Sequence, residues 1–159
     1  MAEEIERKFL VATDAWRDKV RREMRLRQGY FGGGGRCLTR VRSNGRQAWL
    51  NVKSRESGMR RLEFDYEIPL EDAEVMLKKF CDGALIDKTR YWVDDSGHTW
   101  EVDVFHGENA GLIVAEVELK LVTEAVDLPD WVGEEVTDDI RYYNASLVDK
   151  PYSRWRRKR

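Results

Sequence analysis

The sequence predicts a mainly β fold of the α+β class, in which eight antiparallel strands close, or nearly close, into a barrel with flanking helices. Apolar and polar residues alternate along most of the 159 residues, as they do in strands that bury one face. Turn signals containing glycine separate the alternating segments, and only one long segment has helical spacing. We see no linker or internal repeat, so we expect residues 1–159 to form a single domain.

The first strand is expected at residues 4–10. Side chains alternate across a strand, so Glu4, Glu6 and Lys8 share one face while Ile5 begins the opposite face. Two carboxylates and an amine on one face are ordinary if that face meets water. They indicate a reactive site if that face points into the protein, and the rest of the sequence favours this second interpretation.

A short helix and a second strand are expected next. Thr13 can cap a helix that continues through Trp16 and Val20, and a strand follows at residues 23–31. Four glycines at 32–35 then end this strand. They predict a hairpin turn and not a phosphate-binding loop, because no Gly-Lys-Ser/Thr follows them and no helix begins there.

Three more strands precede the main helix. Asn44-Gly45 is a strong hairpin signal between the first two, and Gly58 separates them from the third. The expected strands cover residues 36–44, 46–53 and 60–68.

The one clear helix begins after Pro69 and ends before Gly83, with acidic residues in its first turns and Lys78 and Lys79 in its last. Its apolar stripe consists of Ala73, Met76, Leu77 and Phe80. The last three strands are expected at 84–94, 98–106 and 111–121. Short helical pieces and loops follow from Pro129, and the basic end at about residues 150–159 is expected to be a solvated terminus.

Nearly every predicted strand has one apolar face and one face of mixed charge. For a single strand, the ordinary interpretation is a sheet with a core side and a solvent side. As a set, however, Glu and Arg recur at i, i+2, and the helices need apolar surface to cover. We therefore favour charged faces that point into a wide barrel. These faces carry Glu4, Glu6, Lys8, Arg40, Arg42, Asn51, Lys53, Arg61, Glu63, Asp65, Glu67, Lys88, Arg90, Glu101, Asp103, Glu116, Glu118 and Lys120.

A charged interior predicts specific ligands. Buried charges are costly without partners, and clustered carboxylates take up protons unless a cation neutralises them. Clustered Arg and Lys side chains equally favour an anion, and guanidinium groups suit phosphate oxygens. His98 and His106 are the only histidines, and Cys37 and Cys81 match no zinc spacing. A metal would therefore be held by oxygen, which points to Mg²⁺ or Mn²⁺ together with a polyphosphate.

The composition narrows the class of protein. Aromatic residues are spread through the chain, which argues against disorder, and the net charge of -2 gives no bias towards nucleic acid. We find no signal peptide and no apolar run of membrane-spanning length. We expect a cytoplasmic protein with reduced thiols, no membrane or nucleic-acid partner, and a monomeric or homodimeric state.

In this setting, Glu4-Ile5-Glu6-Arg7-Lys8 resembles the ExExK signature of the CYTH superfamily, the triphosphate tunnel metalloenzymes. An isolated signature of this kind would be weak, but the resemblance continues in order from residue 3 to about residue 148. The further matching segments are Gln28-Gly29-Tyr30, Arg40-Val41-Arg42, Lys53, Glu63 and Glu67, Lys88-Thr89-Arg90-Tyr91, Asp103-Val104-Phe105, Ala115-Glu116-Val117-Glu118 and Asn144.

The resemblance implies an eight-stranded tunnel that cleaves triphosphates with Mg²⁺ or Mn²⁺. It assigns Glu4, Glu6 and Glu118 as primary metal ligands, with Glu116 and Asp103 as further ligands or their supports. The phosphate cradle would be Lys8, Arg40, Arg42, Lys53, Lys88 and Arg90, of which Lys8, Arg40 and Arg42 are expected to act in catalysis. Glu63 and Glu67 would orient these bases or support a second metal.

The small anionic substrate is expected to be inorganic tripolyphosphate, cleaved to pyrophosphate and phosphate, as in the short bacterial members that the chain resembles. An adenylate cyclase, a thiamine triphosphatase and a non-catalytic polyphosphate-binding module stay open as alternatives. Trp49, Trp92 and Trp100 could stack an organic group, although each is more often a packed aromatic residue.

Overall fold

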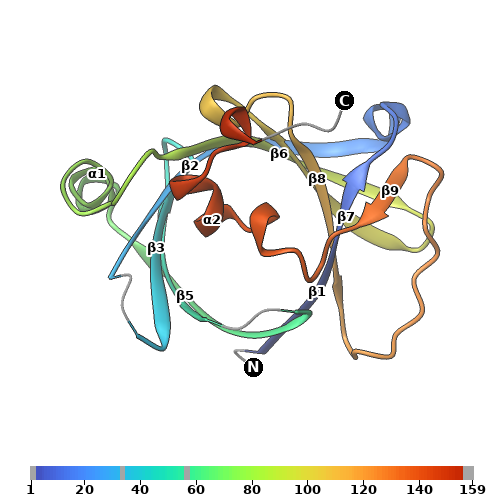
Figure 1. Ribbon diagram of the computed structural model, residues 1–159, viewed down its shortest axis with the longest axis horizontal. Coiled ribbons are helices and arrows are strands. Elements are labelled where there is room, and N and C mark those ends of the chain that lie inside the picture. Colours follow the sequence, from blue (N-terminus) through green and yellow to red (C-terminus); the bar gives the residue numbers. More distant parts are fainter. Residues whose placement is uncertain (1–2, 33–34, 56–57, 156–159) are drawn as a thin grey trace.

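The structure is a computed structural model that describes residues 3–32, 35–55 and 58–155. Within these residues the chain forms a ring of antiparallel strands with one helix outside it and one inside it (Figure 1). The strands are β1 (Glu3–Val11), β2 (Val20–Phe31), β3 (Cys37–Ser43), β4 (Ala48–Ser54), β5 (Arg60–Ile68), β6 (Ile86–Asp95), β7 (His98–Phe105), β8 (Ile113–Leu119) and β9 (Val132–Glu135).

The helices are short. The two α-helices are α1 (Leu70–Lys79) and α2 (Asn144–Asp149), and 3₁₀ turns form at Ala15–Lys19, Gly107–Asn109, Ile140–Tyr142 and Tyr152–Arg154. The helix expected after Pro69 is α1, and the helix expected after Thr13 is the first 3₁₀ turn, where the Thr13 hydroxyl accepts a hydrogen bond from the Ala15 N–H.

Strand order explains how the ring closes. The sheet runs β5-β4-β3-β2-β6-β7-β8-β1-β9, with an additional β5–β1 pairing that joins its two sides. This closing ladder has only three residue pairs, Glu3–Leu62, Glu4–Arg61 and Ile5–Arg60. Strand β1 therefore pairs with β8, β5 and β9, and it carries the first charged residues into the ring.

The predicted strands agree with eight of the nine, with ends that differ by a few residues. Strand β2 begins at Val20, three residues before the predicted start, because its first residues pair with β6. All eight predicted strands are present, and the described residues form one further strand that was not predicted. This strand, β9, has only four residues and lies where loops and short helices were expected.

The apolar faces of most strands point outward and are covered. Below α1, Val41 and Ala48 pack against Ala73 and Leu77. On the opposite side of the ring, a larger core surrounds Trp100 and includes Ile5, Phe9, Trp16, Val93, Val102, Ala115, Val117, Leu119 and Trp131. The outer face of β5 is an exception, because Leu62, Phe64 and Tyr66 are exposed.

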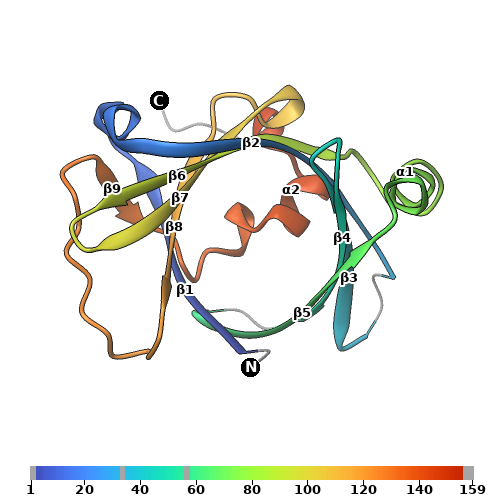
Figure 2. The same ribbon diagram turned by 180° about the vertical axis from the view of Figure 1, so that it is seen from behind.

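The inward-facing positions are charged in the middle of the ring but apolar where α2 packs. Tyr30, Ile86, Phe105 and Val114 surround Leu147 of α2 in one buried cluster. Figure 2 shows α2 and the turn before it inside the ring, as does the opposite view in Figure 1. The C-terminal segment thus enters the ring and fills part of its interior.

The described part of the basic end also packs. Pro151 is buried, and Trp155 contacts the rings of Tyr142 and Tyr152 at centroid distances of 5.0 and 5.1 Å. The expected solvated terminus is therefore wrong for Pro151, Tyr152 and Trp155, which pack, whereas Arg154 is exposed as expected. Arg156, Arg157, Lys158 and Arg159 lie outside the described residues.

Candidate active site

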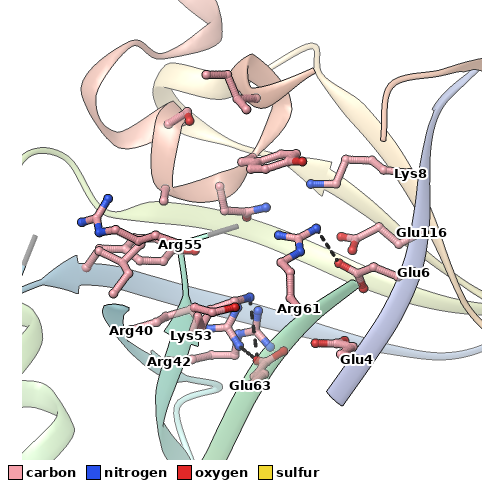
Figure 3. Close-up of a pocket in the computed structure, with 18 of the residues that line it drawn as sticks. Glu4, Glu6, Lys8, Arg40, Arg42, Lys53, Arg55, Arg61, Glu63 and Glu116 are labelled. Atoms are coloured by element: carbon pink, nitrogen blue, oxygen red, sulfur yellow. Dashed lines mark hydrogen bonds and ion pairs between the residues drawn. The ribbon is translucent and has the colours of Figure 1, made fainter. Parts of the chain in front are cut away.

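A cavity of about 440 Å³ occupies the charged part of the ring interior. Figure 3 shows Glu4, Glu6 and Lys8 extending into it from β1, opposite Arg40, Arg42 and Lys53 of β3 and β4. The described side chains that line it are Glu4, Glu6, Lys8, Tyr30, Leu38, Arg40, Arg42, Lys53, Ser54, Arg55, Arg61, Glu63, Lys88, Arg90, Glu101, Glu116, Ile140, Tyr143, Asn144, Ala145 and Ser146.

Carboxylates gather in two hydrogen-bonded pairs. Glu6 bonds Glu116, and Glu4 bonds Glu63, so each pair shares a proton. Burial raises the pKa of Glu4 to about 10 and that of Glu6 to about 8, and the neighbouring carboxylates add to both shifts. Protons are therefore held in the cavity at a pH where isolated glutamates are ionised.

The partners of these two glutamates stay ionised. Burial acts to raise the pKa of Glu116, but Lys8, the hydrogen bond with Glu6, and Arg90 hold it well below its ordinary value. Burial also opposes ionisation of Glu63, whose pKa is nevertheless lowered to about 2 by Glu4, Lys53 and Arg40.

The lysine and arginine side chains that line the cavity, here called the cationic wall, are partly neutralised by carboxylates. Arg40 Nη2 lies 2.9 Å from Glu63 Oε1, and Lys53 Nζ lies 3.8 Å from the same oxygen. Arg61 Nη2 lies 3.3 Å from Glu6 Oε1. Because lysine and arginine line the cavity in greater number than glutamate, positive charge is left over for an anion.

A second group of cations comes from β6. Lys88 Nζ donates to Asp103 Oδ2 at 2.8 Å, and Arg90 forms a two-point contact with the same carboxylate at 2.8 and 2.9 Å. Lys88 is fully buried, and burial lowers its pKa to about 7. Arg90 also contacts Glu101, so Asp103 and Glu101 fix it from two directions.

Tyr143, the residue before α2, contacts two cations with its aromatic ring. The charged groups of Lys8 and Arg61 lie 5.0 and 4.8 Å from the centre of the Tyr143 ring. Lys8 Nζ also donates to the Tyr142 carbonyl at 3.2 Å, and the Tyr143 hydroxyl donates to the Thr137 carbonyl.

The structure brings ten of the predicted site residues together in the cavity lining. They are Glu4, Glu6, Lys8, Arg40, Arg42, Lys53, Glu63, Lys88, Arg90 and Glu116. Asp103 lies behind the lining, buried between Lys88 and Arg90. Glu67 and Glu118 are exposed and lie outside the lining, and Glu67 instead accepts a hydrogen bond from Gln47 at 3.1 Å.

Several lining residues had no assigned role in the sequence interpretation. Arg61 and Glu101 were predicted to lie on the charged faces of their strands, so the alternation in the sequence does identify them. Arg55, Tyr143 and Ser146 come from outside the strands, where alternation carries no information. Trp49, Trp92 and Trp100 are absent from the lining, and Trp100 is buried in the outer core.

Oxygen ligands for a metal are available in the carboxylate pairs. No group of three or more His, Cys, Asp and Glu side chains in residues 3–32, 35–55 and 58–155 forms a ready-made metal site. The Glu6–Glu116 pair nevertheless fits a hard divalent cation, because the proton that it shares marks where positive charge is needed. Mg²⁺ ordinarily keeps water and takes phosphate oxygens as further ligands, so two carboxylates suffice.

Among the described residues, no helix is long and apolar enough to span a membrane.

Comparison with known proteins adds independent information. Residues 2–152 match the family model of the CYTH domain. An inorganic triphosphatase of Acetivibrio thermocellus is 42% identical over 156 residues, which cover 98% of this chain and 99% of that protein. An inorganic triphosphatase of Nitrosomonas europaea is 38% identical over 149 residues, covering 91% of this chain and 96% of that protein.

Solved structures show the same fold. A crystal structure described as that of an inorganic triphosphatase has a TM-score of 0.69 at 35% identity and covers 93% of this chain and 95% of its own. A protein of Pyrococcus horikoshii has a TM-score of 0.59 at 21% identity, covering 76% and 80% of the two chains.

Proposed function

Because the chain belongs to the CYTH domain family, we propose that its ring interior is the active site of an inorganic triphosphatase that cleaves tripolyphosphate to pyrophosphate and phosphate. One observation carries this proposal. A single cavity combines an excess of lysine and arginine with carboxylate pairs that hold protons. This is the arrangement expected for a polyphosphate bound with a divalent cation.

We propose that Glu6 and Glu116 hold Mg²⁺ or Mn²⁺, with Glu4 and Glu63 as a second carboxylate pair nearby. When bound, such an ion neutralises phosphate oxygens and polarises the bond that is cleaved. Arg61 contacts Glu6 and keeps that carboxylate on the cavity side. The exposed position of Glu118 makes it a less favourable ligand than Glu116.

The cations bind and orient the substrate. Lys8 extends from β1, Arg40 and Arg42 from β3, and Lys88 and Arg90 from β6, so phosphate oxygens are contacted from three strands. These groups neutralise negative charge on the phosphoryl group as it transfers, which is the main task of a protein in this chemistry.

Water is the proposed nucleophile. No cysteine or histidine belongs to the described cavity lining, and its carboxylates are engaged in pairs or with cations, which favours water over a side chain as the nucleophile. In-line attack of water on a terminal phosphoryl group needs positioning and charge neutralisation, and the cavity walls supply both.

The aromatic residues favour an inorganic substrate over the alternatives. Among the described residues, only Tyr30 and Tyr143 line the cavity as aromatics. Tyr30 accepts a hydrogen bond from Gln28, and Tyr143 lies against Lys8 and Arg61. The Tyr30 ring is buried in the apolar cluster around Leu147, and the Tyr143 ring already contacts two cations, which disfavours stacking of a nucleotide base or of the thiazolium of thiamine triphosphate.

We further propose that residues 1–159 form one cytoplasmic domain, monomeric or homodimeric. The family match over residues 2–152 supports one domain, and the free thiols of Cys37 and Cys81 suit a reducing compartment.

A substrate panel with product identification tests the function. Tripolyphosphate, ATP, thiamine triphosphate and long-chain polyphosphate would each be incubated with Mg²⁺ and with Mn²⁺. We expect the highest kcat/KM with tripolyphosphate and equal amounts of pyrophosphate and phosphate as products. Cyclic AMP from ATP would identify a cyclase instead, and tight binding without turnover would identify a non-catalytic binding module.

A further inference from the structure

Two amide side chains, Gln28 and Asn144, accept hydrogen bonds from cations of the cavity. Arg42 Nε donates to Gln28 Oε1 at 2.8 Å, and Lys88 Nζ donates to Asn144 Oδ1 at 2.8 Å. A weaker contact of 3.4 Å joins Gln28 Nε2 to Asn144 Oδ1. The two amides therefore connect a cation of β3 with a cation of β6 through β2 and α2.

The chemistry of the partners fixes the direction of these bonds. Arginine and lysine only donate, so the amide oxygens must face them. The Gln28 NH₂ group then points away from Arg42 and donates to the Tyr30 hydroxyl at 2.8 Å. Gln28 is fully buried, so it cannot exchange these partners for bulk water. The orientation of Arg42 is thus set by a neutral group.

Arg42 differs from Arg40, Arg61 and Arg90, which also line the cavity. Arg40, Arg61 and Arg90 each lie within 4 Å of a carboxylate oxygen, whereas no described carboxylate lies that close to Arg42. Burial and the nearby charges of Arg40 and Arg90 lower its pKa to about 9, although Asp103 acts in the opposite direction. Arg42 is half-buried, and a guanidinium in this setting with no described carboxylate in contact favours an anionic ligand.

We propose that Gln28 and Asn144 are positioning residues, which orient Arg42 and Lys88 through neutral oxygens. Gln28 thereby leaves the charge of Arg42 for the substrate phosphates, and Asn144 adds no second negative charge beside Lys88, which already pairs with Asp103. A carboxylate at either position would orient the cation equally well and pair with it more strongly. It would also neutralise Arg42, or place a second negative charge beside Lys88, and either change would weaken the binding of phosphate. The inference rests on the proposed function, because it assumes that a polyphosphate enters the cavity.

The amides can stabilise the fold, and they can preserve positive charge for the substrate, and these two effects can be measured separately. If the amides only stabilise the fold, nearly isosteric acids should serve as well or better, since Arg42 would gain an ion pair and Lys88 a second one. If their neutrality matters to the substrate, the acids should preserve the fold and weaken substrate binding. The informative variants are therefore Gln28→Glu and Asn144→Asp, rather than substitutions by alanine.

A matched control exists outside the cavity. Asn109 is buried, and its Oδ1 accepts a hydrogen bond from the Tyr152 N–H at 2.8 Å. Asn109→Asp adds the same charge at a buried amide and keeps the acceptor, but places no carboxylate beside a cavity cation. Its KM should match that of the unchanged protein.

The experiment measures the thermal midpoint of unfolding, and kcat and KM for tripolyphosphate at saturating Mg²⁺. For Gln28→Glu and Asn144→Asp we expect an unchanged or higher midpoint and a rise in KM of about tenfold or more, the size expected when a charge-assisted hydrogen bond is lost. Titration calorimetry with tripolyphosphate without metal should show the same loss.

A wild-type KM in both acid variants, with both folded, would overturn the inference. If one acid variant does not fold, the other decides, because Gln28 and Asn144 act on different cations. The proposed function fails separately: an unchanged protein that neither binds nor cleaves tripolyphosphate would refute that function before any variant is compared.

Discussion

Lys8 and Glu116 lie directly opposite each other in the antiparallel ladder between β1 and β8. The register thereby places the amine that we assign to phosphate next to a carboxylate that we assign to metal. Lys8 opposes the effect of burial on the pKa of Glu116 and keeps that carboxylate ionised. Because phosphate oxygens can also bind the metal, this pair lies where the proposed metal ligands meet the proposed phosphate-binding cations.

Replacement of Lys8 by alanine should greatly reduce turnover. The amine is held by the Tyr142 carbonyl and the Tyr143 ring, so it is positioned before substrate arrives. We expect Lys8→Ala to lower kcat by about 100-fold or more, as removal of one preorganised charge-stabilising donor does in other enzymes. Steady-state kinetics would measure this change, and circular dichroism would check the fold. Lys79→Ala, on the exposed surface of α1, is the control; a wild-type kcat for Lys8→Ala would remove Lys8 from the site.

Activity should require a divalent cation, and Glu6 should determine the affinity for it. We expect excess chelator to abolish hydrolysis and Mg²⁺ or Mn²⁺ to restore it, because the carboxylate pairs are oxygen ligands. Glu6→Gln should raise the Mg²⁺ concentration for half-maximal rate by about tenfold or more, as loss of one ligand predicts. Glu71→Gln on α1 should behave as the unchanged protein, and full activity in chelator would contradict the prediction.

Glu118→Gln compares the predicted ligand with its position in the structure. Glu118 is exposed, whereas Glu6, its partner in register, lines the cavity. We expect Glu118→Gln to change the half-maximal Mg²⁺ concentration less than Glu6→Gln does. The same metal titrations decide this, and an equal or larger effect for Glu118 would restore it as a primary ligand.

Without metal, the folded protein should lose stability as pH rises between about pH 5 and 7. Glu4 and Glu6 have pKa values raised to about 10 and 8, from 4.5 in an unfolded chain. In this range the folded state holds protons that the unfolded state has released, so the free energy of unfolding falls with pH. Urea unfolding in chelator would measure this slope, and saturating Mg²⁺ should reduce it by replacing the protons. Metal-free stability that rises with pH would show that the carboxylate pairs do not share protons.

The two cysteines should be dispensable for activity. Cys37 is exposed and Cys81 is partly buried, and neither lines the cavity. We expect the Cys37→Ser, Cys81→Ser double variant to keep wild-type kcat and KM, with a modest loss of stability because Cys81 packs near Gly29. Inactivation of a folded double variant would reveal a role that the structure does not indicate.

Much of the fold follows from alternation in the sequence. Glu4, Glu6 and Lys8 share a parity in the sequence and share the cavity in the structure. Strand β9 could not be predicted in this way, because four residues are too few for a period of two to stand out. Its position depends on β1, with which Phe9 and Val11 pair.

The alternation of side chains gives the face of a strand, but it does not determine which part of that strand reaches the cavity. Glu63 and Glu67 lie on the same face of β5, yet only Glu63 lines the cavity, because the strand continues beyond it. No periodic pattern in the sequence predicts the position of Tyr143, since this residue lies between a 3₁₀ turn and α2. Its place beside Lys8 is fixed by the entry of the C-terminal segment into the ring, which is a long-range property of the fold.

The three-pair ladder between β1 and β5 has a consequence for how the protein is made. Strand β1 precedes β5 and β8 in the chain, and most of its ladder pairs with β8, whose residues are synthesised more than a hundred positions later. Contacts of such long sequence separation form slowly. The Glu6–Glu116 pair therefore forms only after β8 has been synthesised and has paired with β1, so a fragment that lacks β8 also lacks the proposed metal ligands of that pair.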